Sequence, residues 1–496
     1  MGKGCGWVGF AFMPGPPSCD GMEGDLVRSF GLELRAVFSF MEPVWHWIYN
    51  LLFTLGFILS APWYFLKLWR RGNWRRGFGQ RFARYGGHVR HAVTNRQVLW
   101  LHAVSVGEVN LCTQLIRALE PRLPNVKIVV STTTTTGMGE LEKRLPSHIL
   151  KVYYPIDFPK YVRKAIAVLH PVAVVLVEAE IWPNFLTRLH RLNIPVFLVN
   201  ARLSARSYRG YRLLGGLFRP LFAGFAGVGC QNEADAEKLR RLGCRPEAVH
   251  VVGNLKYDAA QLEERKVLDV PGMLRQLAVP TNAKIWVAGS THPGEEKIVT
   301  EVFLRLRQRF PDLFLVVVPR HFERAKEAME DMVAAGARVF FRNQITATTQ
   351  LETGEVDCLL VNTTGELRHF YAHADVVFVG KSLAAEGGQN PLEPAALARP
   401  VIFGPNMQNF EAVSRLLVSR GGALQVAHAA ELEEAVAGLL SDEARRLEMG
   451  RQAYRVVQEN LGAVDRTVEM ILAQLRLRED IYIAEPPLAA PEAKRE

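Results

Sequence analysis

Hydrophobic residues follow two different patterns along this chain. A single apolar run covers residues 44–66, whereas from about residue 98 onward short apolar runs rich in β-branched residues alternate with longer amphipathic stretches. The second pattern is typical of parallel βαβ units, because a strand of a parallel sheet is buried on both faces and its connecting helix on only one. The pattern therefore predicts an α/β protein.

The expected strands fall into two series. The first comprises 98–104, 127–132, 172–177, 195–199, 227–230 and 249–252, and the second 285–288, 313–318, 356–361, 376–379 and 400–403. A charged, poorly periodic stretch at about 261–280 separates the series and is typical of a linker. We therefore expect two α/β domains, at 71–265 and 266–480. The composition of 481–496 predicts a disordered tail.

The apolar run at 44–66 is long enough to span a bilayer, and it carries tryptophan and tyrosine near both ends, as segments at a membrane interface do. His46, Asn50 and Thr54 leave its first half only moderately apolar, so a helix lying in the interface is an alternative. A cleaved signal peptide is disfavoured, because cationic residues follow the run instead of preceding it. We predict a membrane-anchor helix with a basic flank at 41–70.

Residues 1–40 are interrupted by glycine and proline and show no period. We expect this segment to be a disordered extension, or to lie outside the native protein if translation starts at Met41. Peptides from residues 1–40 in amino-terminal mass spectrometry would refute the second hypothesis.

Composition and charge reduce the number of possible function classes. The chain has 496 residues, 49% of them hydrophobic, which excludes a disordered chain, and its net charge of +10 suggests an anionic partner. No basic and aromatic platform for nucleic acid occurs later in the chain, and the six cysteines show no CxxC spacing, which suggests a reducing compartment. Basic residues crowd directly behind the apolar run and favour a membrane surface: Lys67, Arg70, Arg71, Arg75, Arg76, Arg81 and Arg84.

Ligands of open parallel sheets bind beyond the carboxyl ends of the strands, so the residues after each strand are candidates for chemistry. Glu108, in HAVSVGE, is either a general base or a structural carboxylate in the first turn of a helix, whose dipole would lower its pKa. Glu178 and Glu180, in EAEIWPNF, share a face if the strand continues through both, and one of them could pair with an arginine of NARLSARS.

Lys256, in GNLKYD at 253–258, lies where the chain is expected to cross to the second domain. A cation at a domain cleft can stabilise a phosphate leaving group, but an ion pair with Asp258 is the alternative. The threonine-rich turn at 131–137 could bind a sugar or a phosphate, or could cap a helix.

Five polar turns in the second domain favour a nucleotide site: 289–296, 319–321, 362–367, 380–383 and 387–394. In the last of them Asn390 suits an N-cap, Pro391 the first helical position and Glu393 the third, while the preceding glycines allow close backbone approach. No Walker A loop or GxGxxG fingerprint follows a strand, so ATP hydrolysis and nicotinamide chemistry lose support. No Asp-x-Asp arrangement suggests a metal, and we expect none.

The motifs taken together resemble those of the 3-deoxy-D-manno-octulosonic acid (Kdo) transferases of lipopolysaccharide synthesis, glycosyltransferase family 30. The resemblance runs from about Met41 to the last helix and rests on HAVSVGE, EAEIWPNF, NARLSARS, QNEADAEKLRRLG, GNLKYD, GSTHPGEE, PRHFER and GGQNPLEP. It implies a GT-B fold of two Rossmann-like domains facing a cleft. It also implies CMP-Kdo as donor, the lipid A precursor (lipid IVA) as acceptor, no metal cofactor and no nucleic acid, and catalytic domains on the cytoplasmic side of the inner membrane.

The same resemblance implies roles for individual residues in an inverting displacement. Glu108 would be the base, and Glu178 and Lys256 would stabilise the transition state, with Glu180 as the alternative acid. Ser290, Thr291 and Lys381 would be weaker donor contacts. The main residues expected to hold CMP are Pro319, Arg320, Thr363, Thr364, Gly365, Asn390, Pro391, Leu392 and Glu393. A nucleotide-sugar epimerase or hydrolase of the same fold and an anchored lipid-binding protein are the competing hypotheses.

Overall fold

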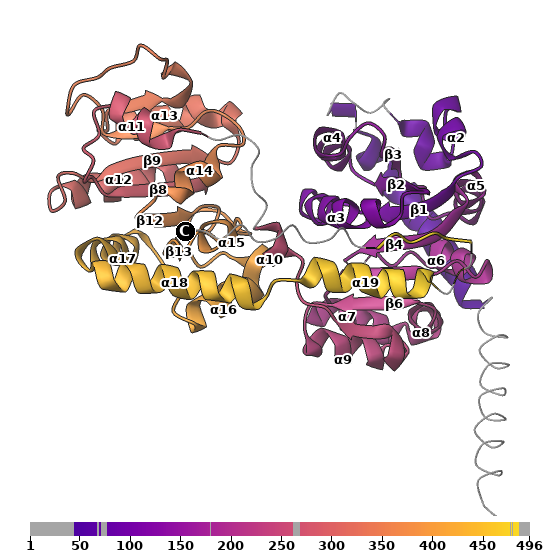
Figure 1. The fold of residues 1–496 in the computed structure, drawn as a ribbon. Helices are drawn as coiled ribbons and strands as arrows, with labels where there is room; N and C mark the ends of the chain where they lie inside the picture. Colours follow the sequence, from indigo (N-terminus) through magenta and orange to yellow (C-terminus); the bar gives the residue numbers. More distant parts are fainter. Residues whose placement is uncertain are drawn as a thin grey trace, which may run out of the picture.

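The computed structural model describes residues 44–66, 69–70, 77–178, 180–260, 268–476, 478 and 480–485. The extension expected at 1–40, most of the expected basic flank and residues 486–496 of the expected tail lie outside these described residues. Figure 1 shows two lobes side by side, each built around one sheet.

Both sheets have seven strands, and every strand pair in them is parallel. The first has the order β3-β2-β1-β4-β5-β6-β7 and the second the order β10-β11-β9-β8-β12-β13-β14. The strands of the first are β1 (Gln97–His102), β2 (Val126–Thr132), β3 (Leu150–Tyr153), β4 (Pro171–Val177), β5 (Val196–Ala201), β6 (Gly227–Cys230) and β7 (Val249–Val251). Those of the second are β8 (Ile285–Thr291), β9 (Phe314–Pro319), β10 (Val339–Phe341), β11 (Cys358–Leu360), β12 (Val376–Val379), β13 (Val401–Phe403) and β14 (Ala423–Gln425). The predicted α/β class is confirmed.

Three strands were not expected from the sequence: β3, β10 and β14. All three are short and lie at a sheet edge. The strand at Leu150–Tyr153 carries a lysine between apolar residues, and the other two have three residues each, so none forms the continuous apolar run that marks a central strand.

The helices lie on both faces of each sheet. In the first half of the chain they are η1 (Phe78–Phe82), α2 (Gly87–Val93), α3 (Val106–Leu119), η2 (Glu120–Arg122), α4 (Thr135–Arg144), α5 (Pro159–Leu169), α6 (Pro183–Arg191), α7 (Ala205–Leu213), α8 (Gly215–Ala223), α9 (Glu233–Arg241), η3 (Pro246–Ala248) and α10 (Lys256–Ala259). In the second half they are α11 (Val270–Gln276), α12 (Glu295–Arg307), η4 (Phe322–Arg324), α13 (Ala325–Ala334), η5 (Arg342–Gln344), α14 (Leu367–Ala372), α15 (Leu392–Ala395), η6 (Gln408–Phe410), α16 (Glu411–Ser419), α17 (Ala429–Ser441), α18 (Glu443–Glu459) and α19 (Ala463–Leu475).

Each sheet separates two hydrophobic cores, which explains why its central strands are apolar at every position. In β1, Trp100 is buried in one core of the first sheet, while Leu99 and Leu101 are buried in the other. In β8, Trp286 and Val287 divide in the same way between the two cores of the second sheet. Successive side chains of a strand point to opposite faces, so both must be apolar where both faces are covered.

The last long helix returns to the first sheet. We expected residues 266–480 to form the second domain, but Ile471, Leu472 and Leu475 of α19 are buried in the same core as Leu99 and Leu101 of β1. Figure 1 shows α18 on the second lobe and α19 following it end to end on the first lobe. We call the first sheet with its helices and α19 the first domain, and the second sheet with α11 to α18 the second domain.

The chain continues to pack on the first domain after α19. Ile481 is buried, and Ala484 exchanges two hydrogen bonds with Arg122, its amide donating to the Arg122 carbonyl at 2.9 Å and its carbonyl accepting from Arg122 Nε at 2.8 Å. The first residues of the tail expected at 481–496 are therefore packed in place.

The helix Val44–Leu66 is long and apolar enough to cross a membrane by length and composition. Its polar residues face the first domain: Tyr49 Oη donates to Asp157 Oδ2 at 2.8 Å, and Asn50 Oδ1 accepts from Asn184 Nδ2 at 2.8 Å. Leu59, 81% exposed, and Trp63, 65% exposed, lie on its open side. Of the three polar residues that made its first half only moderately apolar, His46 and Asn50 thus contact the first domain, whereas Thr54 donates to a carbonyl of its own helix.

Arg81 does not belong to a membrane-facing basic flank. Its side chain is buried, donates to the carbonyl oxygen of Thr133 and stacks over the ring of Tyr153 at 4.1 Å. Arg84, three residues on, is exposed. Of the seven basic residues expected to form the flank, Arg81 is therefore a structural residue of the first domain.

Candidate active site

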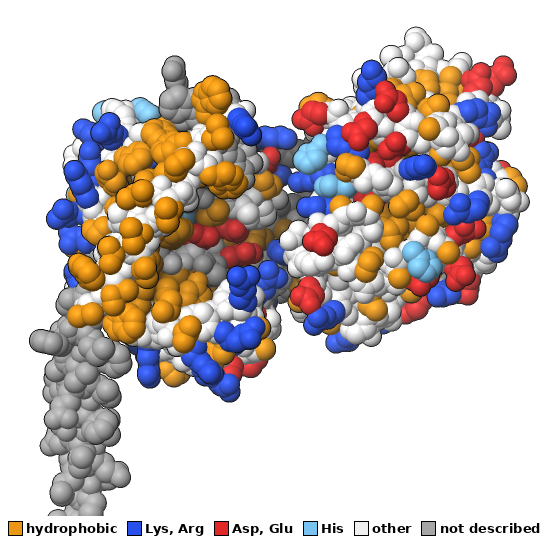
Figure 2. Space-filling model, turned by 180° about the vertical axis from the view of Figure 1, so that it is seen from behind, with side chains coloured by type: hydrophobic (Ala, Val, Ile, Leu, Met, Phe, Trp, Pro, Cys, Tyr) orange, Lys and Arg blue, Asp and Glu red, His pale blue; other side chains and the backbone are white. Residues whose placement is uncertain are grey.

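Three carboxylates gather at the carboxyl ends of two neighbouring strands of the first sheet. Glu108 lies in the first turn of α3, which follows β1, and Glu178 and Glu180 follow β4, the strand next to β1. The charges of Glu178 and Glu180 act on the pKa of Glu108, so the three groups form one cluster. Figure 2 shows acidic side chains in a recess of the left lobe, on the side toward the other lobe and beside a broad hydrophobic surface.

The surroundings of Glu108 fit both interpretations of this residue, as a structural carboxylate in the first turn of a helix and as a general base. It completes a capping box, in which its carboxylate accepts from the amides of Val104 (2.8 Å) and Ser105 (3.4 Å), and Ser105 Oγ accepts from the Glu108 amide (3.2 Å). Burial nevertheless raises the pKa of Glu108, against these hydrogen bonds, and the two nearby carboxylates raise it further. The expected lowering by the helix dipole is therefore wrong, because desolvation outweighs it.

Glu178 is held in an unusual backbone conformation. The strand ends at Val177, and Glu178 has φ 62°, in the left-handed region that favours glycine. Asn200, at the end of β5, has φ 53°, donates to Glu178 Oε1 at 3.4 Å and accepts from the Leu255 amide at 3.2 Å. Asn200 thereby links Glu178 to the segment that precedes Lys256.

Because the chain turns at Glu178, Glu178 and Glu180 have different surroundings. Because β4 does not continue through them, the alternation of a strand does not place them on one face. Glu180 Oε2 accepts from Trp182 Nε1 at 2.9 Å, and burial raises the pKa of Glu180. Glu180 is therefore committed to a neighbouring ring, which favours Glu178 as the acid that meets a substrate.

Lys256 connects the acidic cluster to the second domain. Its Nζ donates to the carbonyl of Asn409 at 3.1 Å and lies 4.7 Å from the centre of the Phe410 ring. Burial lowers the pKa of Lys256, and the charges of Glu178 and Glu108 oppose that shift. Asp258, the alternative partner, instead accepts from the amides of Gly462 (2.8 Å) and Val464 (3.2 Å) at the start of α19.

The second domain brings four of its polar turns together along one edge. They follow β11, β9, β8 and β12, which are neighbours in that order. The Arg320 amide donates to the Thr291 carbonyl at 3.0 Å, and the Gly388 and Gln389 amides donate to the carbonyls of Lys381 (2.8 Å) and Gly380 (3.2 Å). Ser290 and Lys381 both have φ 57°, so the second sheet, like the first, carries left-handed residues at its carboxyl edge.

The residues expected to hold CMP differ in how far their side chains are exposed to a ligand. Arg320, Thr364 and Gly365 are exposed, and Thr363, Asn390 and Glu393 are partly exposed. Pro319, Pro391 and Leu392 are buried, so only their backbone could meet a ligand. Of the weaker candidates, Thr291 is fully buried and its hydroxyl donates to Glu296 Oε1 at 2.9 Å, which removes it as a side-chain contact.

The helix after the two glycines begins one residue later than expected. Asn390 Oδ1 accepts from the Leu392 amide at 3.1 Å and Asn390 Nδ2 donates to Glu393 Oε1 at 3.2 Å, but Pro391 occupies the N-cap position of α15. Gly387 (φ 118°) and Gly388 (φ 70°) require glycine, and a Cβ at Gly388 would lie 2.5 Å from Met407 Sδ. The polar side chains of this turn therefore stabilise the turn by hydrogen bonds within it. Its backbone is the part that a ligand could approach closely.

Sequence analysis missed the residue that organises this edge. Glu295 is fully buried, and its carboxylate accepts from the amides of Lys381 (2.6 Å), Ser382 (2.9 Å), Leu383 (2.9 Å) and His292 (3.0 Å). Glu295 thus fixes the turn that carries Lys381. The signal available was an acid in the first turn of α12 directly after a glycine, which a sequence cannot distinguish from a solvated carboxylate.

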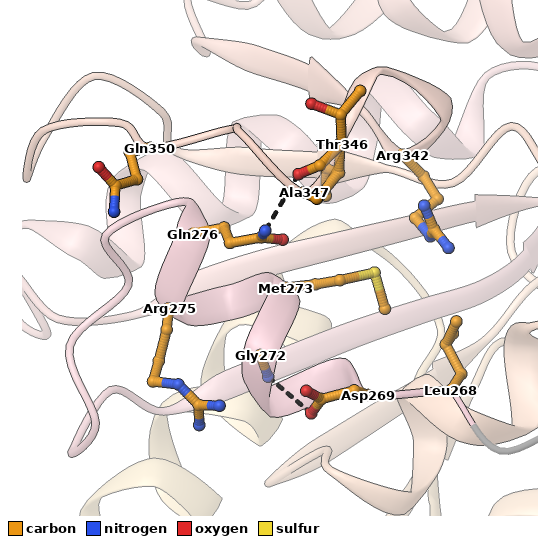
Figure 3. Close-up of a pocket in the computed structure, with 11 residues that line it drawn as sticks. Leu268, Asp269, Gly272, Met273, Arg275, Gln276, Arg342, Thr346, Ala347 and Gln350 are labelled. Carbon is orange, nitrogen blue, oxygen red and sulfur yellow. Dashed lines mark hydrogen bonds between the residues drawn. The ribbon is translucent and has the colours of Figure 1, made fainter.

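A cavity of about 600 Å³ lies elsewhere on the second domain, between α11 and the segment 342–350. Figure 3 shows Arg275 and Arg342 at this cavity, with Gln276 donating to the carbonyl of Thr346 at 3.0 Å. Arg342 pairs with Glu366 at 2.9 Å, which in turn accepts from Thr363 Oγ1 at 2.6 Å. None of the residues predicted for the site lines this cavity, and Arg342 connects it to the Thr363 turn through Glu366.

Comparisons with known proteins identify the family of this chain. A family model described as 3-deoxy-D-manno-octulosonic-acid transferase (kdotransferase) matches residues 76–259. The chain is 33% identical over 398 residues to the 3-deoxy-D-manno-octulosonic acid transferase of Haemophilus influenzae, covering 79% of this chain and 91% of that protein. It is 32% identical over 433 residues to the enzyme of the same description from Bordetella pertussis, covering 84% and 98%.

A solved structure shows the same fold at low identity. The UDP-GlcNAc 2-epimerase of Neisseria meningitidis, bound to UDP-GlcNAc, matches with a TM-score of 0.52 and 15% identity, covering 76% of this chain and all (100%) of that one. This likeness concerns the fold alone, in which two parallel Rossmann-like sheets face each other as in GT-B enzymes.

Proposed function

Because this chain belongs to the Kdo transferase family of glycosyltransferases, we propose that it transfers Kdo from CMP-Kdo to the lipid A precursor lipid IVA. The reaction is an inverting displacement in lipopolysaccharide core synthesis. The observation that carries the proposal is the cluster of Glu108, Glu178 and Lys256, which combines a buried carboxylate of raised pKa with a lysine that contacts the other domain.

Glu108 acts as the base. The acceptor hydroxyl gives its proton to the Glu108 carboxylate while its oxygen forms a bond to the anomeric carbon of Kdo. The bond from that carbon to the phosphate oxygen breaks on the opposite face, and CMP departs with the electron pair. The raised pKa of Glu108 makes it a stronger base than an ordinary glutamate, which favours proton transfer from a hydroxyl. A single displacement inverts the configuration at the anomeric carbon.

Lys256 and Glu178 stabilise the charges that develop during this step. The ammonium of Lys256, at the junction of the domains, neutralises the departing phosphate, and the Glu178 carboxylate faces the electron-poor anomeric carbon. Lys256 binds Asn409 of the second domain, so its position depends on how closely the two domains approach. Lys256 and Arg320 supply enough positive charge for a monophosphate, and we propose that no metal ion takes part.

The second domain holds CMP through its carboxyl edge. Exposed Arg320 binds the phosphate, and the turn at Thr363, Thr364 and Gly365 and the turn from Asn390 to Glu393 hold the nucleoside, with Ser290 and Lys381 beside them. The buried residues Pro319, Pro391 and Leu392 shape the backbone that approaches the ligand.

The helix Val44–Leu66 anchors the enzyme to the cytoplasmic face of the inner membrane. It contacts the first domain through Tyr49 and Asn50, while residues such as Leu59 and Trp63 remain open. A helix with one side bound to the protein and the other apolar side exposed is suited to lie in the membrane interface. This placement brings the first domain to the surface on which a lipid acceptor resides.

Incubation of the purified full-length protein with CMP-Kdo and tetraacylated lipid A precursor tests the proposal directly. Mass spectrometry should show a product heavier by one or more Kdo units, and the same spectrum counts the additions. An unchanged acceptor, alongside an active control enzyme, would contradict the transferase. Release of free Kdo from CMP-Kdo without acceptor modification would instead support the hydrolase hypothesis.

A further inference from the structure

A second cavity lies where the helix Val44–Leu66 meets the first domain. It has a volume of about 200 Å³ and is lined mainly by apolar side chains, among them Phe53, Phe57 and Ala61 of the helix and Trp182 of the domain. Phe53 contacts Phe158 edge to face at 5.1 Å and Trp182 at 6.4 Å, so an aromatic wall joins helix and domain. Nothing in the proposed transfer step uses this cavity.

Neighbouring residues link the cavity to two carboxylates of the acidic cluster, Glu180 and Glu108. On one side Trp182 lines it and donates to Glu180. On the other side Thr133 lines it, and the neighbouring Thr134 donates to the carbonyl of Val104, whose amide binds Glu108. A molecule held in the cavity would therefore lie within one or two residues of the carboxylates that meet the acceptor sugar.

The cavity lies against the helix that carries the exposed apolar surface. The same helix lines it on one side and exposes Leu52, Leu55 and Leu59 on the other. Tyr154, which lines the cavity and stacks on His102 at 4.0 Å, has a buried hydroxyl without a hydrogen-bond partner among the described residues. A ligand that is hydrocarbon over most of its length, with a carbonyl near one end, would satisfy both kinds of lining.

We propose that this cavity holds one acyl chain of the acceptor and so places the acceptor sugar beside Glu108. The proposal rests on the proposed function, because it takes the acceptor to be an acylated sugar. The helix then has a second role besides anchoring, since it forms one wall of the acceptor site. A membrane phospholipid as occupant is the competing possibility, and the experiment distinguishes the two.

Filling the cavity tests the proposal. Ala61→Phe places a ring in the cavity, and Leu59→Phe places one on the open side of the same helix, where the native side chain is 81% exposed. For each full-length variant, KM is measured for the tetraacylated acceptor, for the same disaccharide bisphosphate after chemical deacylation, and for CMP-Kdo. We expect Ala61→Phe to raise KM for the acylated acceptor at least tenfold and to leave the other two constants unchanged. Leu59→Phe should change none of them.

An equal rise in KM for both acceptors, or no change for either, would overturn the proposal. If Ala61→Phe lowers the melting temperature or donor binding, Ala61→Leu gives a milder filling and should shift the preference toward shorter acyl chains. Transfer to neither acceptor by the wild-type protein would refute the proposed function and not the cavity. In that case an acyl glucosamine with a diazirine at the chain end decides the matter by crosslinking.

The crosslinking probe should label peptides containing residues 53–64 and 154–157 in the wild-type protein and not in Ala61→Phe. Labelling that an excess of phosphatidylglycerol abolishes would assign the cavity to membrane lipid. Labelling confined to the open side of the helix would show that no chain enters the cavity. Either result would overturn the proposal.

Discussion

The carboxyl edges of the two sheets differ in how their polar groups are satisfied. In the first domain, burial raises the pKa of Glu108 and Glu180 and lowers that of Lys256, and Glu178 sits in a left-handed conformation. In the second domain the polar side chains mostly hold the turns, as Asn390 does within its own turn and Glu295 does for the turn at Lys381 to Leu383. Buried charges with shifted pKa values are suited to chemistry, and a rigid set of turns is suited to binding. The comparison supports the proposal that catalysis belongs to the first edge and donor binding to the second.

The largest effect should come from Glu108→Gln. Glutamine can still complete the capping box but cannot take a proton, so the variant should fold normally and bind CMP-Kdo while kcat falls by about 10²–10⁴-fold. Single-turnover kinetics and donor titration measure the two properties. Ser105→Ala is the matched control: it breaks the cap, should cost about 0.5–2 kcal/mol of stability and should retain most of the rate. Similar rates in the two variants would mean that Glu108 is only a cap.

Lys256→Gln should lower kcat by about 10²–10³-fold, because it removes a charge that stabilises the departing phosphate. Lys160→Gln, at an exposed lysine of α5, should have no effect and serves as the control. Steady-state kinetics with CMP-Kdo at saturating acceptor gives the comparison. If loss of Lys256 changed only the KM of the donor, the lysine would belong to the binding edge and the division between the two edges would fail.

Glu295→Ala should affect binding more than chemistry. The amides of Lys381, Ser382 and Leu383 would lose their common acceptor, and unsatisfied buried amides cost about 1–3 kcal/mol each. We expect the Kd for CMP to rise about tenfold or more, as 1.4 kcal/mol corresponds to tenfold, with kcat at saturating donor largely kept. Calorimetric titration with CMP provides the measurement, and Glu301→Ala on the same helix the control. Unchanged CMP affinity would exclude this loop from the donor site.

Tyr49→Phe should have the smallest effect on catalysis. It removes one donor to Asp157, whose pKa burial raises to about 7 despite the hydrogen bonds that it accepts from Tyr49, Asn184 and Phe185. Docking of the helix should weaken by about 1–3 kcal/mol, visible as faster hydrogen exchange in residues 44–66 with kcat unchanged. Tyr482→Phe, at a residue 61% exposed, is the control. Unaltered exchange would show that this contact does not hold the helix.

The central strands and the positions of the candidate residues could be predicted because both leave a local mark. Continuous apolar runs identify strands such as β1, and the polar residues directly after them mark Glu108 and Glu178 as candidates, whose roles stay predictions. Short edge strands such as β10 carry no such run. The return of α19 to the first sheet could not be predicted, because its apolar face does not reveal which sheet it covers.

Long-range contacts explain what else the sequence did not show. Glu295 resembles any acid in the first turn of a helix until the loop at 381–384 is seen to fold over it. Burial likewise decides the sign of the pKa shift of Glu108, and burial depends on the tertiary structure and not on the motif. His46, Asn50 and Thr54 weakened the resemblance of the helix Val44–Leu66 to a membrane span, and only the structure shows that His46 and Asn50 contact the first domain.

The pH dependence of kcat/KM in the wild-type enzyme and in Glu108→Gln shows most clearly whether Glu108 is the base. A base must be deprotonated to act, so activity should fall as pH decreases through the pKa of Glu108, which burial raises above the ordinary glutamate value of 4.5. We expect kcat/KM of the wild-type enzyme to fall with decreasing pH at a pH above the ordinary glutamate pKa. The residual kcat/KM of Glu108→Gln should not show this fall. An acid limb that persists unchanged in Glu108→Gln would contradict the account and assign the base to another residue.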